Sequence, residues 1–172
     1  NTTREVHIIG QNIKNIPSHN TIFFHPIFSF QRLGIERILA PFKVFKKLKE
    51  IRPKIFIMGT HELLWIGILY KLLYSCKLIY NVEENYCKNI WYTNAFFSML
   101  RPFLITYVFC KEWFTSLFID QFWLAEKSYQ TELKFATWKN KFEIIENKYH
   151  GKIFKKQQTN QYILKYYCFV TF

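Results

Sequence analysis

Glycine and cysteine are both scarce in this chain of 172 residues, which contains five glycines and four cysteines. Neither G-x-G-x-x-G nor the P-loop pattern G-x-x-x-x-G-K-[ST] occurs, so the sequence has no glycine-rich loop of the kinds that bind nucleotide phosphates. The G-x-S-x-G motif of serine hydrolases is also absent. The cysteines lie far apart without a C-x-x-C pair, which is typical of reduced, mostly buried thiols in a cytosolic protein. The sequence predicts no bound cofactor.

Acidic residues are half as numerous as basic ones, 12 against 24, which gives a net charge of +12. Such a charge indicates an anionic partner, namely a nucleic acid, a phosphorylated substrate or acidic lipid head groups. Long apolar runs are missing as well. The most apolar stretch, Pro102 to Cys110, is far shorter than the roughly 20 residues that a membrane-spanning helix needs, so we expect no segment to cross a bilayer.

The chain nevertheless contains enough apolar surface for one folded domain, because half of its residues are hydrophobic and 20% are aromatic. Short apolar runs alternate with helical patterns through the middle of the chain, which is typical of a parallel sheet. The sequence therefore predicts an α/β fold, a Rossmann-like mainly parallel sheet with helices on both faces. The strands are expected near Val6, Ile22, Ile55, Leu78, Phe122 and Ile144.

A helical period spans residues 33–51, where Pro41 is expected to kink or restart the helix. The apolar positions expected to face the core are Ile38, Phe42, Phe45, Leu48 and Ile51. The opposite face carries the densest basic patch of the chain, formed by Lys43, Lys46, Lys47 and Lys49. A solvated helix face is the ordinary interpretation of such a patch, and contact with an anionic membrane surface is the sharper one.

Two segments rich in aromatic residues lie outside the alternation of strands and helices. Residues 91–118 are mostly apolar and are interrupted at Arg101-Pro102, so we expect two helices, or one kinked helix, that are largely buried. Residues 162–172 are strongly strand-prone and follow a polar, basic linker.

Polar clusters follow two of the predicted strands. Residues 78–82 are followed directly by Glu83, Glu84, Asn85 and Tyr86, and residues 55–58 by Gly59, Thr60, His61 and Glu62. The carboxyl ends of adjacent parallel strands meet at one edge of a sheet, which is where open α/β folds bind ligands. The sequence therefore predicts a site at this edge. The alternative is ordinary local structure, with His61 and Asn85 capping helices and the glutamates in water.

The histidines do not suggest a metal site. His7, His19 and His25 fall on different segments at no ligand spacing. His61-Glu62 does not begin an H-E-x-x-H motif, because Trp65 stands where the second histidine is needed. We expect no bound metal.

The order of these segments resembles the amino-terminal half of a family 4 glycosyltransferase of the GT-B fold. The matching stretches are Lys47 to Glu62, a helix, a strand and a His-containing turn, and Lys77 to Tyr86, a strand that reads "klIYDvHExy" in the family. Asp120 to Tyr129 is similar to the family's "aDxvixaexxy", and Glu143 to Asn147 to its "vixN" strand. Two positions depart from the pattern: Asn81 stands where the family usually has Asp, and Glu83 where it usually has His.

The resemblance implies an enzyme that transfers a sugar from a nucleotide-sugar donor to a glycan or lipid-linked acceptor, as in bacterial-type surface polysaccharide synthesis. It assigns catalytic contacts with sugar hydroxyls to His61 and Glu84. Glu62, Glu83, Asn85 and Tyr86 would form the surrounding substrate-binding wall. The implied location is the cytoplasm, peripheral at the inner face of the membrane, where the basic face of residues 33–51 would meet acidic lipid.

The resemblance also implies a division into domains. Residues 1–150 would form the acceptor-side domain without the family's first strand and helix, residues 151–161 the linker, and residues 162–172 the first strand of a second domain. In the family, that second domain holds the nucleotide-sugar pocket and its paired glutamates. The 172-residue chain alone is therefore expected not to transfer sugar.

The alternative function is a non-enzymatic basic α/β module that binds nucleic acid or an acidic partner. The lysines gather on one helix and in one linker, without interleaved aromatic side chains on which bases could stack, so nucleic acid is not the expected partner. Paired glutamates in a downstream domain would favour the enzyme, and their absence would favour the binding module.

Overall fold

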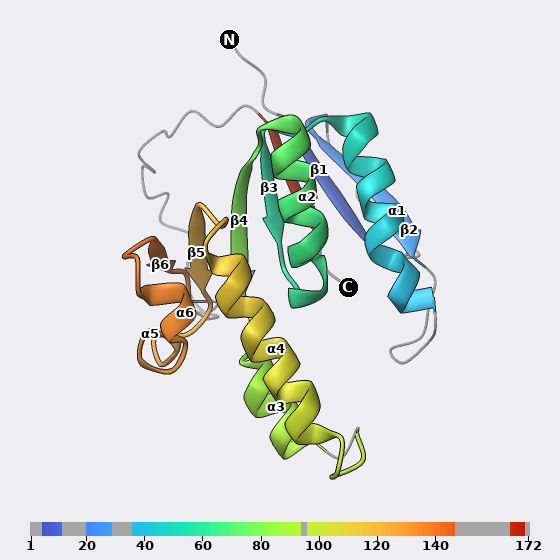
Figure 1. Ribbon diagram of the computed structural model, residues 1–172. Coiled ribbons are helices and arrows are strands. Elements are labelled where there is room, and N and C mark those ends of the chain that lie inside the picture. Colours follow the sequence, from blue (N-terminus) through green and yellow to red (C-terminus); the bar gives the residue numbers. More distant parts are fainter. Residues whose placement is uncertain (1–4, 12–19, 29–35, 94–95, 147–165, 171–172) are drawn as a thin grey trace, which may run out of the picture.

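The computed structural model describes residues 5–11, 20–28, 36–93, 96–146 and 166–170. In this part of the chain, seven strands form one sheet in the order β2-β1-β7-β3-β4-β5-β6, and all neighbours are parallel (Figure 1). The strands are β1 (Glu5–Gln11), β2 (Ile22–Phe28), β3 (Ile55–Met58), β4 (Lys77–Val82), β5 (Gln121–Leu124), β6 (Phe142–Ile144) and β7 (Tyr166–Val170). The helices are α1 (Glu36–Ile51), the 3-10 helix η1 (His61–Leu63), α2 (Leu64–Tyr74), α3 (Tyr86–Tyr92), α4 (Arg101–Ser116), α5 (Tyr129–Glu132) and α6 (Lys134–Thr137).

All six strands expected from the sequence are present, and the predicted α/β fold with a parallel sheet is confirmed. From β3 to β6 the strands lie side by side in chain order, with helices in each connection. Parallel neighbours need such crossovers, because each strand must start again at the edge where the previous one started. These four strands consequently all end at one edge, which we call the carboxyl edge.

The sheet carries an apolar cluster on each face. In β3, Phe56 and Met58 belong to the larger cluster and Ile55 and Ile57 to the smaller one, because side chains alternate along a strand. The larger cluster also takes side chains from α1, α2, α5 and α6. The sequence predicts helices on both faces of the sheet. Among the described residues, helix side chains belong to the larger cluster, and the smaller cluster consists of strand residues alone.

Helix α1 presents a different face to the core from the one predicted. Ala40, Val44 and Leu48, spaced four residues apart, are fully buried, whereas Ile38 is 72% and Phe42 66% exposed. The narrow side chains of Ala40 and Val44 let the helix lie close to its neighbours, which the bulky Ile38 and Phe42 would prevent. The prediction that Ile38 and Phe42 face the core was therefore wrong.

The rest of α1 is closer to expectation. Phe45 and Ile51 are partly buried against the core. Pro41 lies inside one continuous helix and does not end it. Lys47 is half-buried and donates to Glu50 Oε2 at 2.8 Å, and the exposed lysines of the helix are Lys43, Lys46 and Lys49.

In the aromatic segment 91–118, residues 101–116 form α4 as predicted, whereas before Arg101 the described residues are helical only at 91–92, the end of α3. Pro102 lies in the first turn of α4, where its missing N–H costs no helical hydrogen bond. The expectation that this segment is largely buried was wrong, because Phe103 is 75% and Tyr107 56% exposed. The buried residues of α4 are Val108, Lys111, Glu112, Thr115 and Ser116. Like every other helix of the described residues, α4 falls short of what a membrane-spanning helix needs.

Strand β7 lies inside the sheet, between β1 and β3. It pairs with β1 on one side, where Tyr167 lies opposite Val6, and with β3 on the other, where Tyr167 lies opposite Ile55. A strand was predicted here, but as the first strand of a second domain; residues 166–170 instead join this sheet. The expected linker, residues 151–161, lies outside the described residues.

Gly67 allows α2 to lie directly on β3. A Cβ atom at this position would overlap Met58 Sδ and would lie 3.6 Å from Phe56 Cε1. Because α2 connects β3 with β4, this close approach also fixes how the two strands lead into the polar turns at the carboxyl edge.

We expect Gly67→Ala to lower the free energy of unfolding by about 1–3 kcal/mol, because the overlap with Met58 outweighs the roughly 1 kcal/mol gained in helix propensity. Urea denaturation measures the change. The control is the same substitution in a Met58→Ala background, where the overlapping sulfur is absent and the alanine should be tolerated. An equal cost in both backgrounds would contradict the packing argument.

Candidate functional site

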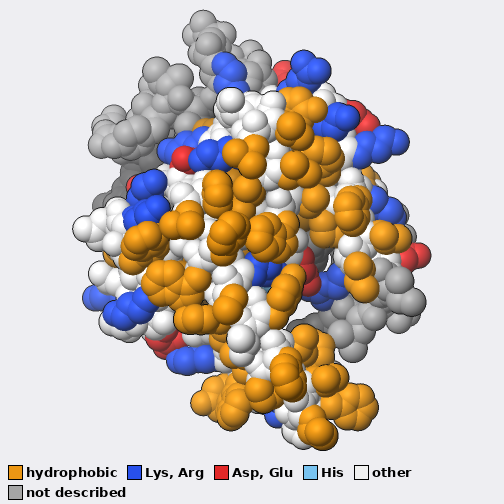
Figure 2. Space-filling model, viewed as in Figure 1, with side chains coloured by type: hydrophobic (Ala, Val, Ile, Leu, Met, Phe, Trp, Pro, Cys, Tyr) orange, Lys and Arg blue, Asp and Glu red, His pale blue; other side chains and the backbone are white. Residues whose placement is uncertain are grey.

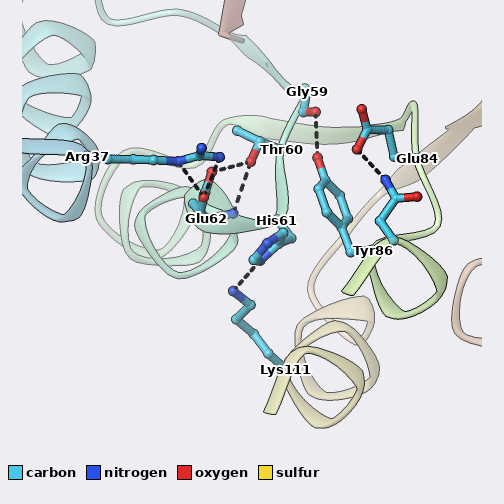
Figure 3. A network of polar contacts seen from close by, with 9 residues as sticks. Arg37, Gly59, Thr60, His61, Glu62, Glu84, Tyr86 and Lys111 are labelled. Atoms are coloured by element: carbon cyan, nitrogen blue, oxygen red, sulfur yellow. Dashed lines mark hydrogen bonds and ion pairs between the residues drawn. The ribbon is translucent and has the colours of Figure 1, made fainter. Parts of the chain in front are cut away.

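The polar turns that follow β3 and β4 lie next to each other at the carboxyl edge, because Met58 and Tyr80 are opposite one another in adjacent parallel strands. His61 and Glu62 come from η1, and residues 83–86 from the turn that leads into α3. Figure 3 shows that the two segments meet, and that the inner face of α4 lies against His61. The predicted adjacency of these turns is therefore confirmed.

Glu62 is held on both of its carboxylate oxygens. Arg37 of α1 places Nε 2.8 Å and Nη2 2.7 Å from Glu62 Oε1, and Thr60 Oγ1 donates to Oε2 at 2.6 Å (Figure 3). Thr60 is also the N-cap of η1, since its Oγ1 accepts the N–H of Glu62 at 3.4 Å. These contacts tie the turn after β3 to α1 and set the position of His61.

His61 lies between Tyr86 and Lys111. Its ring meets the Tyr86 ring edge-on, with 4.3 Å between centroids, and its Nδ1 lies 2.6 Å from Lys111 Nζ. Burial lowers the pKa of His61 to about 3, and the positive charges of Lys111 and Arg37 add to this shift. The imidazole is therefore neutral at pH 7. Because its Nδ1 accepts from the ammonium group of Lys111, its proton lies on Nε2, which is a hydrogen-bond donor.

Helix α4 brings two ionisable groups into this buried region. Lys111 is 5% and Glu112 4% exposed, and Glu112 Oε1 accepts the O–H of buried Tyr80 at 3.0 Å. Burial raises the pKa of Glu112 to about 7, against the opposing effects of Tyr80 and Lys111. Burial also lowers the pKa of Lys111 to about 8, against the opposing charges of Glu112 and Glu62. Two buried groups thus titrate close to neutral pH, a property that is concentrated at functional sites.

Tyr86 connects this buried cluster with the turn after β4. Its O–H lies 3.5 Å from the carbonyl oxygen of Gly59, and burial raises the pKa of Tyr86 far above its usual range, so the group stays a neutral hydroxyl. Glu84 lies beside Tyr86 at the surface, where its carboxylate accepts from Asn89 Nδ2 at 2.7 Å (Figure 3).

An open pocket of about 430 Å³ adjoins the turn after β4. Four of its nine lining residues are glutamates, and the lining consists of Glu83, Glu84, Asn85, Lys88, Asn89, Glu126, Ser128, Tyr129 and Glu132. Burial, with the nearby charge of Glu84, raises the pKa of Glu83. Asn85 caps α3 by accepting the N–H of Lys88 at 3.1 Å, as the alternative interpretation predicted.

The predicted site residues thus divide between two places. His61 and Tyr86, both partly buried, lie with the buried Lys111 and Glu112 in what we call the buried cluster, and the partly buried Glu62 lies next to it. Glu83 and Asn85 line the pocket. Glu84 lies where the two meet, because it lines the pocket and stands beside Tyr86 (Figure 3).

Sequence reasoning missed Arg37, Tyr80, Lys111 and Glu112. A signal for two of them was present: in an otherwise apolar helix, Lys111 and Glu112 share one face with Thr115 at helical spacing. A polar stripe on a helix ordinarily faces water, so the pattern marks Lys111 and Glu112 as a group but does not place them in the core.

The histidines near the amino terminus form a separate contact. His7 Nδ1 lies 3.0 Å from His25 Nε2, and the two rings are stacked with 5.3 Å between centroids. His19 lies outside the described residues. Within the part of the chain that the structure describes, no three His, Cys, Asp or Glu side chains are grouped so as to hold a metal ion.

Comparison with known proteins adds no identity to this geometry: no protein-family model matches the chain, and no curated protein matches it in sequence. The likeness to glycosyltransferases stays a prediction that depends on the order of the motifs. The function must therefore be argued from the site itself.

Glu112 leads to a prediction about stability and pH. Its folded-state pKa, about 7, lies above its ordinary value of 4.5, so between these values the folded chain holds a proton that the unfolded chain has lost. The stability due to this proton is complete below pH 4.5 and is lost as the pH rises through 7. Glu112→Gln should therefore match the parent chain at acidic pH and exceed it at pH 8 by about 1–3 kcal/mol.

Thermal unfolding of the parent chain and of Glu112→Gln at several pH values measures this difference. The shifted pKa of His61 is common to both proteins and cancels, whereas the pKa of Lys111, which the charge of Glu112 raises, changes in the variant and contributes to the difference above pH 7. Glu143→Gln is the matched control, because Glu143 is exposed on β6 and should show no pH-dependent difference. Parallel stability curves for the parent and Glu112→Gln would show that Glu112 has the same pKa in the folded and the unfolded chain, and would contradict the prediction.

Proposed function

We propose that this chain is the acceptor-side half of a glycosyltransferase that moves a sugar from a nucleotide-sugar donor to a glycan or lipid-linked acceptor. The observation that carries the proposal is the buried cluster of His61, Tyr86, Lys111 and Glu112 at the carboxyl edge of a parallel sheet. This edge is where open α/β folds bind their ligands. The order of the motifs between Lys47 and Asn147 supports the same function.

The chemistry of the cluster suits sugar hydroxyls, each of which both donates and accepts hydrogen bonds. The Nε2–H of His61 is a donor, and the exposed carboxylate of Glu84 is an acceptor. In this proposal these two groups orient the acceptor, and Glu62 keeps His61 in place by fixing η1. Glu83 and Asn85 form the wall along which further hydroxyls bind.

The two positions that depart from the family pattern contact one another. Asn81 Nδ2 donates to Glu83 Oε1 at 2.8 Å. An aspartate and a histidine at these positions could form the same contact with donor and acceptor exchanged. The pair is therefore compatible with a preserved frame for the turn after β4, and it supports a place for Glu83 in the site.

In this proposal the nucleotide and the leaving phosphate are bound by a second domain. Catalysis then consists of orienting the acceptor here and of stabilising charge there. The 172-residue chain binds an acceptor but does not transfer sugar. We place the enzyme in the cytoplasm at the inner face of the membrane, in the synthesis of surface polysaccharide, with the lysines of α1 toward acidic lipid.

The proposal is tested by titrating the purified chain with a panel of short hexose oligosaccharides and following the ring signals of His61 and Tyr86 by NMR. An oligosaccharide that binds should shift both signals. Glu84→Gln should weaken binding by about tenfold, because a hydrogen bond to a charged acceptor is replaced by one to a neutral amide. Its melting temperature should not change, since Glu84 is exposed.

Glu143→Gln, which changes an exposed carboxylate on β6 that does not line the pocket, serves as the control and should bind like the parent. A panel in which no oligosaccharide shifts the His61 signals would remove the carbohydrate site. Appreciable turnover of a nucleotide-sugar by the chain alone would contradict the assignment of donor chemistry to a second domain.

A further inference from the structure

Helix α4 has its polar face inside and its aromatic face outside. Lys111, Glu112 and Thr115 are at most 5% exposed, although a helix of a water-soluble domain ordinarily buries its apolar side. Phe103 is 75%, Tyr107 56%, Phe109 51% and Phe114 50% exposed. Single exposed apolar residues need no explanation, but an entire aromatic helix face does.

The connection between α3 and α4 is the most apolar part of this surface. The side chains that form it, which we call the apolar tip, are Trp91, Tyr92, Phe97, Met99, Leu100 and Phe103, and each is between 51% and 84% exposed. Arg101 holds the tip together, because its Nε donates to the carbonyl of Phe96 at 3.1 Å and its Nη1 to that of Trp91 at 3.2 Å. The exposed side chains of the tip therefore belong to a connection that these two hydrogen bonds hold in place.

The apolar surface continues from α4 onto α2. The rings of Trp65 and Phe114 are in contact at 5.5 Å between centroids, although both side chains are about half exposed. Leu69 and Leu72 of α2 are also exposed, at 44% and 68%. Figure 2 shows hydrophobic side chains gathered across this face and at the end of the hairpin of α3 and α4, with Lys and Arg side chains around them.

The charge of the hairpin has one sign. No acidic residue occurs between Glu84 and Glu112, whereas Lys88 and Arg101 lie in this interval and the chain as a whole has a net charge of +12. Lys88 is paired with Glu132 at 2.8 Å, but positive charge prevails over the chain as a whole, and an apolar surface on a positively charged protein is complementary to a bilayer that contains acidic lipid. Trp and Tyr, which occur at the tip, are the residues that favour the head-group level of a membrane.

We propose that the hairpin of α3 and α4 is a membrane-docking element whose apolar tip inserts into the head-group region of an acidic bilayer. The hairpin projects beyond the carboxyl edge of the sheet (Figure 1), and such a convex element can enter a fluid lipid surface without a matching groove. The contact differs from the one expected at the lysines of α1, because it depends on aromatic insertion as well as on charge. It does not depend on the proposed sugar chemistry.

The docking element and the buried cluster share a helix. Lys111 and Glu112 lie on the inner face of α4, and Tyr107 and Phe114 on the outer face of the same helix. A bilayer bound at the outer face would thus lie one helix away from the groups at the carboxyl edge. A substrate that reaches Lys111, Glu112 and their neighbours from the bound bilayer would therefore be a molecule anchored in lipid.

The test uses the complete 172-residue chain and its flotation with phosphatidylcholine vesicles that do or do not contain phosphatidylglycerol. We expect the chain to float with the acidic vesicles. Salt should weaken this flotation but not abolish it, because the insertion of aromatic side chains is insensitive to ionic strength. Phe97→Ser with Phe103→Ser should reduce partitioning by about tenfold or more. Brominated lipid should quench the tryptophan fluorescence of the parent chain more strongly than that of Trp91→Phe, because Trp91 lies at the tip.

Ile144→Ser with Ile145→Ser is the matched control, because these side chains are 37% and 41% exposed and lie in and directly after β6, on neither the hairpin nor α1. The control should float like the parent, and circular dichroism should be the same for all variants. Flotation lost equally in the control, or unchanged in the tip variant, would overturn the proposal. A concentration-dependent dimer that only the tip variant abolishes, without binding to vesicles, would also overturn it and assign the tip to a second copy of the chain.

Discussion

The contact between the polar face of α4 and the carboxyl ends of β3 and β4 determines much of this structure. Lys111 meets His61 after β3, and Glu112 meets Tyr80 within β4. A helix that commits its polar side chains to these two contacts has to turn its remaining, aromatic side chains outward. The neutral histidine, the near-neutral titration of two buried groups and the apolar outer surface all follow from this one orientation of α4.

Such an arrangement is not a simple source of stability. Removing a lysine and a carboxylate from water costs several kcal/mol for each ion, and their hydrogen bonds offset that cost only in part. A core of apolar side chains would be expected to be at least as stable. The presence of Lys111 and Glu112 beside the usual ligand-binding edge of a parallel sheet is therefore better explained by the chemistry of a site than by the needs of the fold.

The sequence is most informative where one physical requirement dominates. Strands such as β3 and β4 are buried on both faces, so their runs of apolar residues are recognisable, and the polar turns that follow them are equally distinct. The orientation of α1 was not predictable, because Ile38 and Phe42 form one apolar stripe and Ala40, Val44 and Leu48 another. Which stripe is buried depends on how closely the helix can approach its neighbours, which no local pattern contains.

The candidate site, like the fold, could be predicted from the sequence only in part. Residues that directly follow a strand, such as His61 and Glu84, can be assigned to the carboxyl edge from chain order alone. Lys111 and Arg37 reach the site from helices that are distant in sequence, and only the packing of α1 and α4 brings them there. The partners that set the protonation of His61 are therefore the part of the site that the sequence conceals.

The position of β7 has a consequence for the biosynthesis of the protein. Among the described residues, β1 and β2 are hydrogen-bonded to the rest of the sheet only through β7. On the ribosome, the growing chain therefore contains two separate pieces of sheet until residues 166–170 have been synthesised, and the edges of β1 and β3 are unpaired until then. Contacts between segments so far apart in the chain form slowly, and open edges invite pairing with other chains. The nascent chain should thus depend on chaperones until residues 166–170 have been synthesised.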